Sequence, residues 1–227
     1  MEQAKTFNAD AYKKQAWQQL KDRWGVPIAM TLVSFSACVG VFVIAFFYSI
    51  FNSLFAKVFL FLGVWLVQII LRIPKSCIYV GMVRRSDKQH ISFFGKKIKD
   101  TWSLGIKSNV IRYLLLFFWM LLLIFPLFIK YYAYSQMTYI LAEHSKISIT
   151  KAIKLSAIIT KGHKKDLFLM QVSFLGWFLL TVIFTGGIGF LWLSSYVNLS
   201  FANAYAAMKY EALVMEKIPE QLRAEIV

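Results

Sequence analysis

The side chains of this 227-residue chain that could do chemistry are mostly neutral and polar, and they lie within apolar stretches. In lipid such groups hydrogen-bond across helices, with about 0.5–2 kcal/mol for each bond. They either hold neighbouring helices together or line a polar cavity at the bundle centre that holds a headgroup or a peptide. The candidate cluster is Tyr134, Ser135, Gln136, Thr138, Gln171, Ser173, Asn198 and Asn203.

Familiar catalytic and metal-binding patterns are missing from the sequence. It contains no H-E-x-x-H motif, no G-x-S-x-G motif and no glycine-rich phosphate loop. His90, His144 and His163 have no cysteine or second histidine at ligand spacing, and we expect them to be solvated at the membrane surface. We therefore predict no catalytic residue, no cofactor and no metal. An enzymatic function would require a pair of buried ionisable groups in contact.

Acidic residues are scarce where apolar residues are dense. No Asp or Glu occurs between Arg23 and Ser86, and Glu143, Asp166 and Glu211 each lie at the predicted edge of a later apolar stretch. Ion-coupled transporters commonly rely on ionisable groups buried in the membrane. We expect no buried carboxylate here, which argues against an autonomous proton-coupled pump.

The composition indicates a membrane protein. Apolar residues make up 59% of the chain and charged residues 16%, whereas soluble domains carry about a quarter charged residues. The net charge is +15, and the basic residues lie between the apolar runs, where anionic lipid attracts them. We expect no nucleic-acid partner, because no motif supports one. The candidate contacts to anionic headgroups are Arg84, Arg85, Lys96, Lys97, Lys151, Lys154, Lys164 and Lys165.

We predict an all-α, polytopic transmembrane bundle of about six membrane segments with amphipathic interfacial helices. An N-terminal amphipathic cytoplasmic helix occupies residues 1–25, with Asn8 as its N-cap and Gly25 as its stop. The transmembrane domain covers 26–208, and a cytoplasmic tail follows at 209–227. Hairpins are expected at about 26–73, 110–143 and 167–208, with basic cytoplasmic loops at 84–112 and 144–166. These loops carry surface helices near 92–103 and after Ser148.

The threading follows from the loop charges. Because both basic loops are expected in the cytoplasm, the chain between them crosses the membrane an even number of times, and both termini are cytoplasmic. Residues 113–143 are short for two full spans. Two shortened, tilted spans or a re-entrant second leg are favoured. A single kinked span stays open as the alternative.

Short motifs spread over nearly the whole chain resemble one family. They are LKxxWG (Leu20–Gly25), ILA (Ile140–Ala142), SxxxAIxxS (Ser148–Ser156), SFxGW (Ser173–Trp177) and the glycine turn before Tyr196. The chain resembles the bacterial integral membrane family called domain of unknown function 975, although Pro126-Leu127 and Ser195-Tyr196 replace the family's frequent Pro-Gly and Pro-Tyr. The resemblance implies a bacterial plasma-membrane protein and no enzyme activity.

We therefore expect a non-enzymatic integral membrane protein that binds anionic lipid or acts as an accessory to a membrane-protein partner. One alternative is an immunity protein against a membrane-active peptide or bacteriocin, which a neighbouring toxin gene would favour. Another is a small transporter or flippase component. A continuous water-accessible cavity through the polar cluster would favour that alternative, and a solidly packed bundle would count against it.

Overall fold

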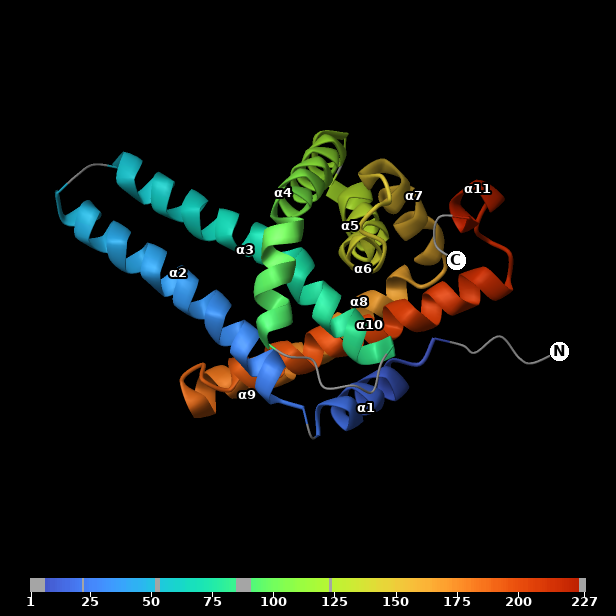
Figure 1. The fold of residues 1–227 in the computed structure, drawn as a ribbon, viewed down its shortest axis with the longest axis horizontal. Helices are drawn as coiled ribbons and strands as arrows, with labels where there is room; N and C mark the ends of the chain where they lie inside the picture. Colours follow the sequence, from blue (N-terminus) through green and yellow to red (C-terminus); the bar gives the residue numbers. More distant parts are fainter. Residues whose placement is uncertain (1–6, 22, 52–53, 85–90, 123, 225–227) are drawn as a thin grey trace.

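The computed structural model describes residues 7–21, 23–51, 54–84, 91–122 and 124–224, which form eleven helices and no strand (Figure 1). The predicted all-α class is therefore confirmed for this part of the chain. The helices are α1 (Ala9–Leu20), α2 (Gly25–Phe51), α3 (Leu54–Arg84), α4 (Ile91–Leu122), α5 (Ile124–Ala133), α6 (Met137–Glu143), α7 (Ile149–Ile159), α8 (Lys164–Ser173), α9 (Leu175–Thr185), α10 (Phe190–Val214) and α11 (Glu220–Arg223).

Two long hairpins frame the molecule. Helices α2 and α3 run side by side, and α3 continues through Pro74 to Arg84 (Figure 1). Helices α8 and α9 lead into a turn at Gly186 and Gly187, from which α10 returns. These glycines have φ values of 57° and 93°, a left-handed conformation that favours glycine. The predicted turn is confirmed.

Helix α4 corrects the prediction for residues 84–112. The expected surface helix near 92–103 and the apolar run after it form one continuous helix. Gly105 does not interrupt that helix, because its lack of a side chain serves packing instead. A Cβ atom there would lie 3.4 Å from the carbonyl oxygens of Ile69 and Ile70. Gly105 thus lets α4 pack closely on α3.

The N-terminal helix begins as predicted and ends earlier. The Asn8 side chain accepts a hydrogen bond from the backbone N–H of Ala11 at 3.0 Å, as an N-cap does. Helix α1 ends at Leu20, and Gly25 begins α2. The prediction that Gly25 stops α1 was therefore wrong, because Gly25 adopts no positive φ and opens the next helix.

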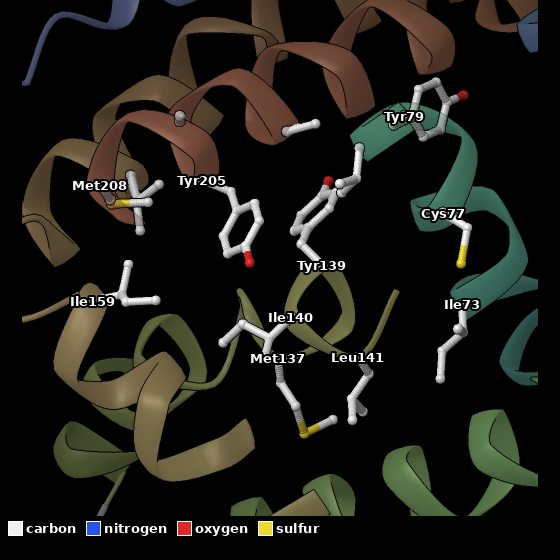
Figure 2. Close-up of a cluster of buried hydrophobic side chains, with 14 of the residues drawn as sticks. Ile73, Cys77, Tyr79, Met137, Tyr139, Ile140, Leu141, Ile159, Tyr205 and Met208 are labelled. Atoms are coloured by element: carbon white, nitrogen blue, oxygen red, sulfur yellow. The ribbon is translucent and has the colours of Figure 1, made fainter. Parts of the chain in front are cut away.

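The centre of the core is the short helix α6. Its Met137, Ile140 and Leu141 are fully buried, the helix packs against α3 and α7, and its Tyr139 stacks on Tyr205 of α10 (Figure 2). Helix α7 also turns its apolar face into the protein. Ala152, Leu155 and Ile159 are buried, and Ser156 Oγ donates to the Ala133 carbonyl oxygen at 2.7 Å, so this amphipathic helix packs on the protein through its apolar face.

Two stretches in the described part of the chain are long and apolar enough to cross a membrane: Leu62–Arg84 and Lys164–Thr185. This is fewer than the six segments predicted. The second stretch buries little of its surface inside the protein, and α9 has no buried residue. Its Ile183 and Phe184 side chains are among the most exposed large apolar groups of the molecule.

Candidate functional site

A cavity of about 820 Å³ is lined by residues of helices α2, α3, α4, α5, α6, α8 and α10 and of the turn at 186–188. Ser135, Gln136, Thr138, Gln171 and Asn198 from the predicted polar cluster line it. The other three members lie elsewhere. Tyr134 is buried in the core, and the exposed Ser173 bonds the Met170 carbonyl of its own helix.

Asn203 holds two helices together. Its Nδ2 donates to Gln19 Oε1 at 2.9 Å, and Gln19 Nε2 donates to Asn203 Oδ1 at 3.2 Å, which joins α10 to α1. The two interpretations of the polar cluster therefore apply to different residues. Asn203 joins helices, whereas five others face the cavity.

Three cations line the cavity: Arg72, Lys75 and Arg112. Among the described residues that form its wall there is no Asp or Glu. None of the three is among the candidate site residues predicted from the sequence. A signal was present in the sequence, because Gln68, Arg72, Ser76 and Tyr79 recur at helical spacing and form one polar face of α3.

Arg112 is the most unusual of these cations. It is 2% exposed, and within the described structure its Nε and Nη1 atoms have no hydrogen-bond partner. Its guanidinium Cζ lies 5.5 Å from the centre of the Tyr131 ring, a favourable cation–π contact. Among the described residues, none forms an ion pair with Arg112. Burying a charge is costly unless the charge is paired, so this site favours an anionic ligand.

Helix α4 also positions Arg72. Arg72 Nη1 lies 3.5 Å from both Asn109 Oδ1 and the Tyr113 hydroxyl, at the long limit of a hydrogen bond. Asn109 is oriented by its own bond from Nδ2 to the Gly105 carbonyl oxygen at 2.9 Å. Neutral partners therefore hold Arg72 without cancelling its charge.

Gln136 also lines the cavity, and its side chain has a buried acceptor. Ser135 Oγ uses its single proton to donate to the Tyr132 carbonyl oxygen at 2.7 Å. It must therefore accept from Gln136 Nε2, which lies 3.0 Å away. This network orients the amide. Gln136 is 1% exposed, and its Oε1 has no hydrogen-bond partner in the described structure.

The predicted headgroup contacts do not line the cavity. Lys151, Lys154 and Lys165 are exposed, Lys164 is half-buried, and Arg84 is exposed and ion-paired. Arg85 and the side chains of Lys96 and Lys97 lie outside the described part of the chain.

A second site surrounds Glu143, whose side chain is 2% exposed. Its carboxylate pairs with Lys209 at 2.6 Å and with Arg84, lies 3.3 Å from His144 Nε2, and accepts a hydrogen bond from the Tyr205 hydroxyl. We call these five residues the Glu143 cluster. It joins α3, α6 and α10. The expectation that the chain has no buried carboxylate was wrong.

Glu143 and Lys209 are two buried ionisable groups in contact, which is the condition given above for an enzymatic function. However, side chains of the chain itself contact both carboxylate oxygens. None of the five residues lines the cavity. Nor does the described part of the chain contain a group of three or more His, Cys, Asp or Glu that could hold a metal ion. The cluster is therefore suited to join helices.

The open end of the second hairpin carries a further ion pair. His163 Nε2 lies 3.0 Å from Glu211 Oε2, and Lys217 Nζ lies 2.9 Å from Glu211 Oε1. Partial burial opposes ionisation of Glu211, but the hydrogen bonds from Lys217 and His163 outweigh it and lower the pKa of the carboxyl. These contacts hold the C-terminal end of α10 beside the start of α8.

Residues 103–212 match the family described as "Protein of unknown function (DUF975)". The match covers 110 of the 227 residues. The resemblance seen in the sequence is thus confirmed, and the DUF975 segment includes Arg112, Gln136 and Glu143, whereas Arg72 precedes it. No curated protein and no solved structure matches the chain.

Proposed function

We propose that this protein is a non-enzymatic integral membrane protein that binds the anionic headgroup of a lipid-like molecule in its central cavity. The observation that carries the proposal is Arg112, a buried cation without an anion in a cavity wall that contains Arg72 and Lys75 and no described carboxylate. A bound anion would supply the missing counterion. Charge-assisted hydrogen bonds of this kind are roughly twice as strong as neutral ones.

The remaining wall of the cavity suits the rest of such a ligand. Phe35, Phe190, Leu191 and Phe201 contribute apolar surface from α2 and α10. Ligand sites are typically apolar with a few well-placed polar groups, and they have volumes of about 300–1,000 Å³. The cavity volume of about 820 Å³ falls in that range. An amphiphile would place its charge on the arginines and its apolar part on this wall.

The threading is part of the proposal: six membrane segments in a bacterial plasma membrane, with both termini in the cytoplasm. Helices α5 and α6, of 10 and 7 residues, are each too short to cross a bilayer, because their lengths are about 15 and 10 Å. Together they would form one broken segment. A break at membrane depth is tolerated where it lines a cavity, as Ser135 and Gln136 do here.

Site-directed labelling tests this threading. In a chain whose Cys38 and Cys77 are replaced by serine, single cysteines at Lys161 and at the exposed Ile188 lie at opposite ends of α8–α9. An impermeant maleimide is expected to label them from opposite sides of the membrane. Labelling from the same side would contradict the threading.

A small transporter or flippase component is the second candidate function. The cavity supports it, because five residues of the polar cluster line one space and the broken α5–α6 segment contributes to the wall. Broken helices that carry binding sites are common in transporters. Tyr134, Ser173 and Asn203 lie outside this space, so the cluster lines it only in part.

Native mass spectrometry of lipid binding tests the proposal. The purified, delipidated protein is titrated with phosphatidylglycerol and, in parallel, with phosphatidylcholine. We expect Arg112→Gln to remove one tightly bound phosphatidylglycerol. Lys107→Gln, which removes the same charge from an exposed position on the same helix, is expected to keep it. Equal binding by the wild type and Arg112→Gln would overturn the proposal.

A further inference from the structure

The buried cavity-lining atoms that have no partner in the described structure are of two kinds, which narrows the chemistry of the ligand. Arg112 Nε and Nη1 are donors, whereas Gln136 Oε1 is an acceptor. A bare anion would satisfy only the arginine. The buried carbonyl oxygen of Gln136 requires a ligand that also donates a hydrogen bond.

Arg112 and Gln136 act on the same part of the cavity. The Arg112 guanidinium stacks over Tyr131, and Gln136 is tied through Ser135 to the carbonyl of the adjacent Tyr132. Both groups therefore border the same short stretch at the end of α5. Because both residues line one cavity, our inference places a single headgroup against both.

The charge of the wall selects the kind of donor. An ammonium group would donate to Gln136 Oε1, but it would meet Arg72, Lys75 and Arg112 with no carboxylate among the described lining residues. Like charges repel strongly in a low-dielectric site. A hydroxyl donates equally well and carries no charge. The donor that fits is therefore a neutral hydroxyl.

We infer that the cavity binds a polyol phosphate, with the phosphate on Arg112 and Arg72 and a hydroxyl of the polyol donating to Gln136 Oε1. This inference rests on the proposed function and specifies its ligand. A phosphate offers several acceptor oxygens to two arginines, whose guanidinium groups suit phosphate recognition. The same chemistry occurs in a glycerophosphate lipid headgroup and in soluble glycerophosphodiesters.

Two lipids of equal charge separate the hydroxyl from the phosphate. Phosphatidylglycerol and phosphatidylmethanol each carry one phosphodiester, but only the first has headgroup hydroxyls. We measure the binding of each to the full-length protein by native mass spectrometry. The wild type is expected to bind phosphatidylglycerol about fivefold to tenfold more tightly, the effect of one hydrogen bond to a buried acceptor.

Variants locate the preference. Gln136→Met keeps the side-chain length and removes the acceptor, so both lipids are expected to bind equally. Ser173→Ala removes a polar group outside the cavity and is expected to retain the preference. A preference that survives in Gln136→Met would overturn the role of Gln136. The wild-type comparison tests the hydroxyl even if that variant does not fold.

The outcomes distinguish this inference from the proposed function. If the wild type binds both lipids equally and Arg112→Gln binds neither, the role of the headgroup hydroxyl is overturned and the anion site is supported. Binding of neither lipid would overturn both. Competition by soluble glycerophosphoglycerol would support the inference with the headgroup alone as ligand. If glycerophosphoglycerol does not compete although the protein clearly prefers phosphatidylglycerol, the result supports the inference with a lipid as the ligand.

Discussion

The cavity and the Glu143 cluster both bury positive charge, but they neutralise it differently. In the cluster, Glu143 contacts Lys209, Arg84, His144 and Tyr205, so the chain supplies its own counterion. In the cavity, two Arg112 nitrogen atoms have no hydrogen-bond partner in the described structure, and no described lining residue is acidic. A cation that is paired within the chain joins helices, whereas a buried cation without a counterion leaves a place for an anionic ligand. The contrast supports the cavity as the proposed ligand site.

Removing the anion of the cluster is expected to have the largest effect. Glu143→Gln leaves Lys209 and Arg84 without their carboxylate and should lower the free energy of unfolding by about 3–5 kcal/mol. Thermal unfolding in detergent measures this. The double variant Glu143→Gln/Lys209→Met should recover part of the loss, because it also removes the unpaired buried cation. A single variant as stable as the wild type would contradict the assignment of a cation paired within the chain.

Removing the cavity cation is expected to act in the opposite direction. In delipidated protein, Arg112→Gln should raise the free energy of unfolding by about 1–3 kcal/mol, because a buried charge without an anion is lost. Phosphatidylglycerol should then stabilise the wild type by about 2.7 kcal/mol at a hundredfold excess over its dissociation constant. The variant should show no such gain. Destabilisation without lipid would show that Arg112 is already paired.

The pH dependence sharpens the description of the cluster. Burial, with the charges of Lys209 and Arg84, lowers the pKa of His144 to about 4, below its ordinary value of 6.5. Between these values the unfolded chain binds a proton that the folded chain does not, so stability falls as the pH falls through this window. His144→Gln is expected to flatten the slope of melting temperature against pH from 6.5 to 4. An unchanged slope would contradict the account.

The exposed lysines of α7 should give the smallest effect. Lys151→Gln and Lys154→Gln each remove about 1 kcal/mol of attraction to anionic vesicles at low salt, where exposed charges contribute most. This loss should fade at high salt, whereas binding in the buried cavity should persist. Vesicle co-sedimentation at two ionic strengths measures the difference. Equal salt sensitivity of both sites would remove the distinction between surface and cavity.

Local features of the fold could be predicted from the sequence. The Gly186–Gly187 turn requires positive φ, and the Asn8 cap uses a side chain only three residues from its partner. Five residues of the polar cluster were found because polar groups within apolar stretches are conspicuous. In each case the information lies within a few neighbouring residues.

The site's charges depended on packing between distant elements. Glu143 can be buried because Lys209, 66 residues away in the sequence, pairs with it. In the sequence, a carboxylate at the end of an apolar stretch looks like a residue at the membrane edge. Arg72 faces the cavity because Gly105 brings α4 against α3, a contact that periodicity alone does not reveal. The union of residues 91–122 into one helix likewise reflects packing rather than a local signal.

Solid-state NMR distance measurement between arginine and lipid phosphate tests the central claim most directly. The protein is labelled with nitrogen-15 in its arginine guanidinium groups and placed in phosphatidylglycerol bilayers, where coupling to phosphorus-31 is recorded. We predict a nitrogen–phosphorus coupling that places a guanidinium group within hydrogen-bond distance of a lipid phosphate. This coupling should disappear in Arg112→Gln and persist in Lys107→Gln. A phosphate coupling that is the same in the wild type and Arg112→Gln would contradict the cavity as an anion site.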